Sequence, residues 1–175
     1  MTPHHLGRPA TGEYLPYFGQ YIDRVPEGAI VEQLTSQLDA TCRLLAPLST
    51  EQVNYRPKPE DWNILEVLGH ITDGERVFTY RALRIARNDP TPLASFDQDL
   101  FVANADSASR PLADLLDEYA AVRRATLTLF RSFSPVAWLH TGVAADHPIS
   151  VRALAYITAG HELHHIADFH QRYHL

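Results

Sequence analysis

Apolar residues recur at steps of three and four along four long stretches of this 175-residue chain. This period matches one face of an α-helix, so each stretch predicts an amphipathic helix. The expected helices span about residues 27–46, 63–87, 111–133 and 150–172. Helices of this kind bury their apolar faces against one another. The chain is therefore expected to be all-α, a four-helix bundle in a single domain over residues 1–175, without a β-strand of any length.

Residues with strong end preferences mark the limits of these helices. Pro47 stops the first helix, because proline cannot continue the backbone hydrogen bonds. Asn63, followed three residues later by Glu66, resembles a capping box at the start of the second helix. Pro111 suits the first turn of the third helix, and Ser150 suits the N-cap of the fourth. The four stretches thus carry helical end signals as well as the helical period.

The connection between the second and third helices is unusually long. It covers residues 88–110, whereas links within helix bundles usually have about two to eight residues. A link of this length can cross the whole bundle, so the second and third helices are expected to run parallel. The segment "FDQDLF", residues 96–101, lies in this link. We expect it either to line the mouth of a pocket or to be a loop anchored by its two phenylalanines.

The first 26 residues form a separate arm in this interpretation. Prolines at positions 3, 9, 16 and 26 prevent a regular helix there. Four aromatic residues lie among them, namely Tyr14, Tyr17, Phe18 and Tyr21. We expect the arm to pack on the body of the protein or on a neighbouring subunit.

Charge, hydropathy and cysteine content exclude several classes of function. The net charge of -6 argues against a general nucleic-acid-binding protein. No apolar run approaches the roughly 20 residues of a membrane span, and the N-terminal stretch has no signal-peptide pattern. Cys42 is the single cysteine, so no intrachain disulfide can form. We expect a cytoplasmic protein with neither a nucleic acid nor a membrane as partner. An inert, buried thiol is the favoured interpretation of Cys42.

The stretch "GHELHHIADFHQ", residues 160–171, places four histidines in the fourth helix. His161 and His165 continue the apolar stripe of that helix, so they are expected to point inward. They lie one turn apart, and their side chains can reach a single point. Together with Glu162 they have the His-Glu-x-x-His spacing of metal ligands. His164 is the competing partner of His161, and a hydrogen-bonded structural pair in the core is the alternative to a metal site.

A third ligand has to come from another helix, and His70 in "EVLGHITDGE" is the candidate. It shares a helix face with Glu66 and Asp73, which resembles a ligand with nearby carboxylates. Gly74 follows one turn later and costs about 1 kcal/mol of helix stability relative to alanine. We expect this glycine to leave space above the imidazole of His70 for a substrate or water.

The order of these motifs resembles the DinB-like (YfiT-like) superfamily. "DWNILEVLGHITDGERVFTYRALRIARND", then "FDQD", then "AGHELHHI" carry the resemblance, which extends from about residue 14 to residue 173. It implies an up-down-down-up four-helix bundle that forms a homodimer. It also implies a divalent transition metal, zinc or nickel, bound by His70, His161 and His165. His164 would then be a neighbour of the metal ligands.

The same resemblance implies an enzyme acting on a small molecule. The favoured activity is transfer of a low-molecular-weight thiol, such as bacillithiol or mycothiol, to a small electrophile; the alternative is a metal-dependent hydrolase. A three-ligand metal has an open position for a thiolate or for water. His164, Asp73 and Glu162 are the candidates for moving protons, and Arg76 or Arg81 for holding an acidic thiol.

A non-catalytic dimeric bundle with an interaction role is the rival class. Its metal, if any, would be structural, but structural zinc sites normally have four protein ligands. Three histidines without a nearby cysteine argue against such a site. The aromatic residues of the N-terminal arm would still suit an interface.

Overall fold

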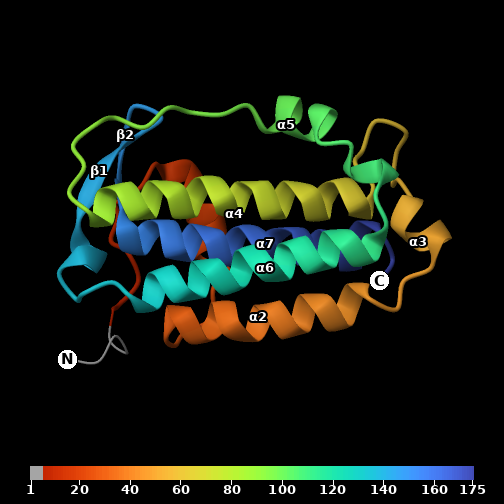
Figure 1. The fold of residues 1–175 in the computed structure, drawn as a ribbon, viewed down its shortest axis with the longest axis horizontal. Helices are drawn as coiled ribbons and strands as arrows, with labels where there is room; N and C mark the ends of the chain where they lie inside the picture. The colour runs from red at the N-terminus through yellow and green to blue at the C-terminus, as the bar shows by residue number, and fades with distance from the viewer. Residues whose placement is uncertain (1–5) are drawn as a thin grey trace.

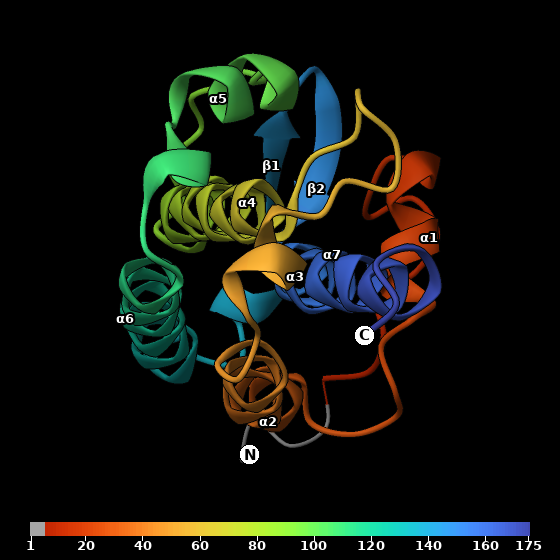
Figure 2. The same ribbon diagram turned by 90° about the vertical axis from the view of Figure 1, so that its right-hand side faces the viewer.

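The computed structural model describes residues 6–175 and shows a bundle of four long helices (Figure 1). These are α2 (Ile30–Leu45), α4 (Ile64–Ala86), α6 (Leu112–Arg131) and α7 (Val151–Arg172). Viewed end-on, they occupy the corners of a square, so that each helix packs against two neighbours (Figure 2). Within residues 6–175, no helix has the length and hydropathy needed to cross a membrane. The predicted four-helix bundle is confirmed.

The long connection lets α4 and α6 run in the same direction. In Figure 1 it leaves the end of α4, passes along the outside of that helix and enters α6 at the opposite end of the bundle. It contains α5 (Gln98–Asn104) and a 3-10 turn, η3 (Ser107–Ser109). The helices α2 and α7 run the other way. The parallel pair expected from the link and the up-down-down-up order implied by the family resemblance are therefore both present.

The capping residues predicted from sequence act at two of the helix starts. The Asn63 side chain accepts a hydrogen bond from the Glu66 backbone N–H at 2.9 Å, and the Glu66 carboxylate accepts one from the Asn63 N–H at 2.8 Å. The Ser150 hydroxyl accepts a hydrogen bond from the Ala153 N–H at 3.0 Å. Pro111 lies one residue before α6, in the N-cap position. These bonds satisfy N–H groups that have no partner inside the helix.

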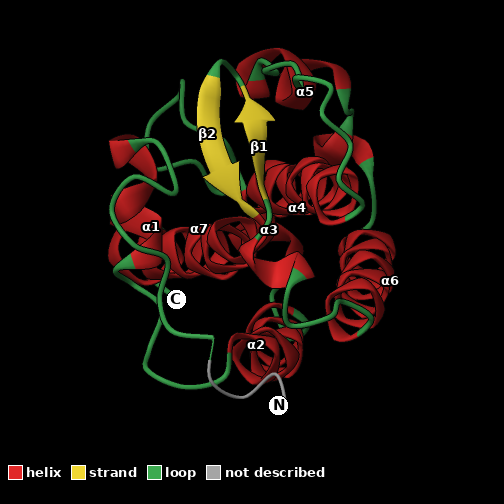
Figure 3. Ribbon diagram, turned by 90° about the vertical axis from the view of Figure 1, so that its left-hand side faces the viewer, coloured by secondary structure: helices red, strands yellow, loops and turns green. Residues whose placement is uncertain are grey.

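A β-hairpin precedes α7, so the expectation of no strand was wrong. Strand β1 (Thr141–Ala144) pairs antiparallel with β2 (His147–Ser150) at the end of the bundle (Figure 3). The turn residues Ala145 and Asp146 have φ of 50° and 64°, as a type I′ turn requires. Strands of four residues are too short to show an alternating pattern. The turn also lacks the usual glycine, so the sequence carried no hairpin signal.

The remaining elements are short. They are η2 (Pro16–Phe18), α1 (Gly19–Ile22), α3 (Thr50–Asn54) and η4 (Ala137–Leu139). The first two belong to the N-terminal arm, of which residues 1–5 lie outside the described part of the chain. The expectation that the prolines prevent a regular helix in the arm was therefore wrong for one short turn, because Gly19–Ile22 contains no proline. Tyr21 and Ile22 of α1 are buried, and α1 packs along α7. Gly160 permits this contact, because a Cβ at that position would lie 2.0 Å from the Tyr21 carbonyl oxygen.

The apolar core consists of two clusters separated by a layer of polar side chains. One cluster lies toward the hairpin and includes Phe78, Phe130 and Leu154; the other lies toward α3 and includes Leu68 and Phe169. Between them, along the middle of the helices, are the buried side chains of His70, Glu75, Arg123, His161 and Glu162. Buried polar groups are costly unless they are paired. A function that needs buried polar groups is therefore expected in this middle layer.

Candidate metal centre

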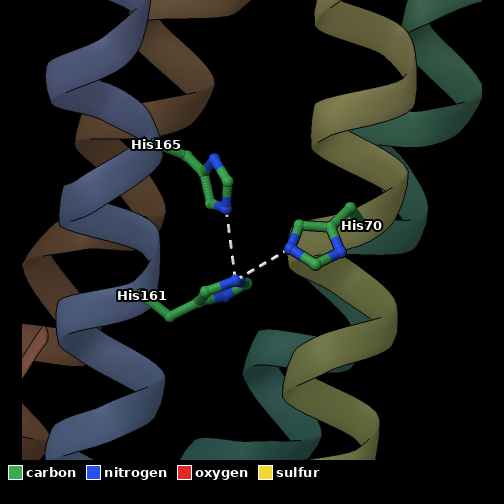
Figure 4. A group of neighbouring side chains, drawn as sticks. All are labelled: His70, His161 and His165. Carbon is green, nitrogen blue, oxygen red and sulfur yellow. Dashed lines mark hydrogen bonds between the residues drawn. The ribbon is translucent and has the colours of Figure 1, made fainter. Parts of the chain in front are cut away.

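Three imidazoles from two helices converge in the polar layer. His70 of α4 faces His161 and His165 of α7 (Figure 4). The Nε2 atoms of His70 and His161 are 2.9 Å apart, and those of His161 and His165 are 3.2 Å apart. One ligand nitrogen from each ring lies within 4.8 Å of the other two. The structure thus brings together the three residues that were expected to be metal ligands.

Burial keeps these three imidazoles neutral at physiological pH. Burial lowers the pKa of His70 to about 4 and that of His165 to about 3. It also lowers the pKa of His161 far below its usual range, and the neighbouring rings add to the effect. A neutral imidazole has a free lone pair, which is the form that binds metal ions. The site therefore presents three nitrogen donors without any need to remove a proton.

The spacing of the nitrogens fits a single tetrahedral ion. Bonds of about 2.1 Å at tetrahedral angles place two nitrogens about 3.4 Å apart. The observed separations of 2.9 and 3.2 Å are only a few tenths of an ångström shorter. The donor set consists of three neutral imidazoles, which suits zinc, nickel and similar ions.

Aromatic rings surround the histidines on several sides. The Trp62 ring lies 5.0 Å from that of His70, and Phe78 meets His161 edge-on at 5.7 Å. Tyr21, from the N-terminal arm, packs against both His161 and His164 at 5.4 Å. These rings limit the access of water to the histidines, which strengthens electrostatic interactions inside the site.

A cavity of about 240 Å³ opens beside His70 and His161. Its wall combines aromatic residues of the arm, α4 and the long connection with a few polar groups. The lining residues are Tyr17, Phe18, Tyr21, His70, Gly74, Phe78, Arg81, Phe96, Gln98 and His161. Cavities of this mostly apolar kind, with a few polar groups, are typical of small-molecule sites. The expectation that "FDQDLF" lines a pocket agrees with the positions of Phe96 and Gln98, and Phe96 also packs on Phe101 at 5.2 Å.

A second cavity of about 310 Å³ lies on the other side, beside His165. Its wall is more polar and includes Asp99 and Asp168. His164, His165 and Asp168 form a second group whose potential ligand atoms lie within 4.8 Å of one another. The centre is thus bordered by an aromatic cavity and by an acidic one.

The three candidates for moving protons are placed very differently. His164 borders the centre: its ring lies 5.1 Å from that of His165, and its Nε2 is 3.8 Å from the Asp168 carboxylate. Asp73 is partly exposed and forms an ion pair with Arg76 at 3.0 Å. Its charge still reaches His70, where it opposes the lowering of the pKa by burial.

Glu162 points away from the three histidines. Its carboxylate accepts hydrogen bonds from Tyr119 at 2.7 Å and from Arg123 at 2.6 Å, both on α6, and from Thr41 on α2. Arg123 also binds the carboxylate of Glu75 at 2.8 Å. The structure therefore places Glu162 in a buried ionic network behind the histidines, although the His-Glu-x-x-His spacing predicted it beside them.

Gly74 lines the aromatic cavity beside His70, but the place of its missing side chain is not open. A Cβ at position 74 would lie 3.2 Å from the Cε1 atom of His161, so the imidazole of His161 fills this place. The glycine instead allows α4 and α7 to approach closely at the site. Of the two candidate arginines, Arg81 lines the aromatic cavity, whereas Arg76 is paired with Glu118 and Asp73. Cys42 lies apart from the histidine centre, and burial raises its pKa.

Sequence reasoning missed several residues of the site. Trp62, Phe78 and Tyr21 surround the histidines, but nothing in the sequence assigned them to the site, and Tyr21 was expected only to pack with the rest of the arm. Arg123 and Glu75 were also missed, because an isolated charged residue in an amphipathic helix is usually exposed. One sequence signal could have located Arg123. It falls one turn after Tyr119, on the buried side of α6.

A four-helix bundle with a long crossover and three converging histidines defines the class of this protein. Residues 33–169 match the sequence profile of the DinB superfamily, so the chain belongs to that superfamily. The fold is similar to that of YfiT from Bacillus subtilis, with a TM-score of 0.71 and 14% sequence identity. That similarity covers 97% of this chain and 94% of the YfiT chain. YfiT is described as a probable metal-dependent hydrolase with an unusual four-helix bundle topology. A search of curated proteins found no match.

Proposed function

We propose that this protein is a metal-dependent enzyme acting on a small molecule, with His70, His161 and His165 as ligands of a divalent zinc or nickel ion. The observation that carries the proposal is the convergence of three neutral imidazole nitrogens between two cavities. A three-ligand centre has room for a further ligand, whereas structural zinc sites are closed by four. When bound, the metal would act as a Lewis acid that lowers the pKa of a thiol or of water.

Transfer of a low-molecular-weight thiol to a small electrophile is the reaction that the aromatic cavity favours. In this reaction a sulfur–carbon bond forms, the leaving group departs with its electron pair, and the thiol loses its proton to a base. Water competes with the thiol as a nucleophile, so a site that excludes water favours transfer. Tyr21 and Phe78 beside His161 supply such an apolar wall.

Among the candidates for moving protons, His164 is best placed to accept one. Burial lowers its pKa, so it is neutral at physiological pH. Its Nδ1 atom is buried without a hydrogen-bond partner in the described chain. We propose that Asp73 influences His70 through its charge and that Glu162 holds α7 against α6. Neither carboxylate is proposed to take the proton directly.

Hydrolysis is the second candidate reaction. The acidic cavity beside His165 favours it, because Asp99 and Asp168 provide a polar surface where water can reach the centre. The fold likeness to YfiT, named as a probable metal-dependent hydrolase, supports the same candidate. In hydrolysis the water oxygen bonds to the electrophilic atom, the bond to the leaving group breaks, and the product carries no sulfur from the thiol. Product analysis therefore separates the two reactions.

Metal content tests the proposed centre. We expect the untagged protein to hold about one transition metal per chain, measured by mass spectrometry. His70→Ala and His161→Ala should lose it while retaining the helical circular dichroism of the wild type. His147→Ala is the matched control, because His147 lies exposed in the hairpin, and it should keep the metal. No metal in the wild type after incubation with Zn²⁺ or Ni²⁺ would overturn the proposal.

The loaded protein should then be assayed with thiols plus electrophiles and with ester substrates. A sulfur-containing adduct whose formation requires the metal would support thiol transfer, whereas thiol-independent cleavage would support hydrolysis. The homodimer implied by the family resemblance stays a prediction. Light scattering would distinguish a mass of 19.7 kDa from twice that value.

A further inference from the structure

Arg81 is a buried cation in the wall of the aromatic cavity. Only 5% of its surface is exposed, although it carries a full positive charge. Its Nη2 atom donates a hydrogen bond to the Ala94 carbonyl oxygen at 2.7 Å, and the Phe96 ring lies 5.7 Å from its Cζ atom. Among residues 6–175, no carboxylate forms an ion pair with it. Burial lowers the pKa of Arg81, with no acidic group acting against this effect.

The other deeply buried arginine shows what Arg81 lacks. Arg123 is 0% exposed and binds the carboxylates of both Glu75 and Glu162. Buried charges in proteins are usually compensated in this way, because an unpaired charge inside a protein is strongly destabilising. A guanidinium has five N–H donors and cannot be deprotonated near neutral pH. Arg81 therefore has donors and charge available for an anion that the chain itself does not provide.

We propose that Arg81 binds the carboxylate or phosphate group of a small organic anion that occupies this cavity. The inference rests on the proposed function, because it assigns the substrate or thiol of that site to a chemical class. Arginine suits the role, since its planar fork can donate two parallel hydrogen bonds to either group. The aromatic rings of Phe18, Phe78 and Phe96 would hold the apolar part of the same molecule.

The placement of Arg81 along α4 sets the orientation of the bound molecule. His70, Gly74, Phe78 and Arg81 follow one another at steps of four, four and three, so they share one face of the helix. Eleven residues of helix correspond to a rise of about 16 Å. The cavity extends along this face from the histidines toward the connection that contains Phe96. The anionic group would thus lie at the far end, with the reacting atom near His70 and His161.

A purely structural role for Arg81 makes opposite predictions. Its hydrogen bond to Ala94 could simply tie the long connection to α4. In that case Arg81→Met should lower the melting temperature and leave anion binding unchanged. If Arg81 is instead an anion receptor, the same variant removes an unpaired buried charge. It should then melt at the same temperature as the wild type or higher, and lose affinity for anions.

Calorimetric titration of the full chain with benzoate, phenyl phosphate and neutral benzamide tests the inference. Each probe is added to metal-free and to zinc-loaded protein. We expect at least one of the two anions to bind the wild type more tightly than benzamide does. Arg81→Met should weaken that binding by about ten- to a hundredfold, as expected for loss of a charged hydrogen bond. A preference for one anion would identify the group as a carboxylate or a phosphate.

Arg87→Met is the matched control. It removes the same charge from the same end of α4, but Arg87 is exposed and stacks on Phe133 outside the cavity. Equal anion affinity in Arg81→Met and wild type, or no binding of either anion to the wild type, would overturn the inference. The metal-free titration keeps this test separate from the test of the proposed function. A protein that holds no metal can still bind anions at Arg81, and a protein that holds metal can fail to bind them.

Discussion

Arg123 has a full positive charge in the middle of the bundle, where it joins all four long helices. It lies on α6, and its two carboxylate partners, Glu75 and Glu162, lie on α4 and α7. It also donates a hydrogen bond to the Leu34 carbonyl oxygen of α2 at 3.1 Å. Burial lowers the pKa of Arg123, but the two carboxylates outweigh burial and leave that pKa above its ordinary value. The network thus fixes the helices around the histidine centre.

Removal of Arg123 should be strongly destabilising. Arg123→Met leaves two carboxylates buried without their cation, which typically costs about 3–5 kcal/mol. Urea unfolding followed by circular dichroism would measure this loss. The triple variant Arg123→Met, Glu75→Gln, Glu162→Gln should recover part of it, because the buried charges are then gone. A loss below about 1 kcal/mol in the single variant would show that the network contributes little to stability.

At the scale of elements, the contact between α1 and α7 brings the N-terminal arm to the site. Gly160 lies one residue before His161, and Tyr21 of the arm packs against the His161 ring. Helix propensity alone predicts that Gly160→Ala stabilises the protein by about 1 kcal/mol. The clash with the Tyr21 carbonyl should reverse that sign and cost about 1–3 kcal/mol. Thermal unfolding would show which effect dominates.

Gly7→Ala provides the control for this experiment. A Cβ at Gly7 would meet no atom within 4 Å, so its effect should stay within about 0.5 kcal/mol. We also expect Gly160→Ala to make the arm more sensitive to limited proteolysis, because the arm must move away from α7. An unchanged or higher melting temperature in Gly160→Ala would contradict the close approach of the two elements.

A second contact ties the arm to the start of α7 and depends on pH. Glu13 accepts hydrogen bonds from the Arg152 Nε atom and the Ser150 hydroxyl, each at 2.7 Å. The bond from Arg152 is the main cause that lowers the pKa of Glu13 to about 2. A carboxyl with a lowered pKa stabilises the fold at pH values above its ordinary pKa of 4.5, and this stabilisation is lost as the pH falls toward 2.

Glu13→Gln should therefore destabilise the protein in a pH-dependent way. The expected cost at pH 7 is about 1 kcal/mol, since the ion pair is partly exposed to solvent. The difference between wild type and variant should shrink as the pH is lowered from 4.5 toward 2. Urea unfolding at a series of pH values measures the difference. A difference that stays constant over that range would mean that the Glu13 charge has no part in stability.

At the scale of the whole molecule, two apolar clusters hold the bundle together on either side of the polar layer. The fold therefore does not depend on a metal for its core. We expect chelated protein to stay folded, and zinc at a hundredfold excess over its Kd to add about 2.7 kcal/mol. For a chain of this length, that gain raises the melting temperature by roughly 5–10 °C.

Calorimetry in the presence of zinc or of a chelator checks this expectation. His161→Ala should abolish the zinc-dependent shift, because it removes the nitrogen that is closest to both other ligands. Unfolding of the wild type by the chelator would show instead that the metal is structural. An unchanged melting temperature with zinc would argue against binding to the native state.

The sequence by itself was sufficient to predict the four helices and the parallel crossover, and to name the three histidines as candidate ligands. Periodicity, capping residues and loop length are local properties, so they can be read without knowing which segments meet. His161 and His165 could be paired for the same reason, because one helical turn brings them together.

Only the tertiary structure decided which residues surround that site. Tyr21 reaches the His161 ring from the N-terminal arm, a segment far from α7 in the chain, and no local pattern encodes such a contact. The burial of Arg123 and the turning of Glu162 toward it depend on charges from three helices meeting in one layer. The hairpin forms because it packs on the end of α4, where Gly142 fits against Ile85. Long-range packing and charge compensation thus set the chemistry of the centre that the histidine spacing had located.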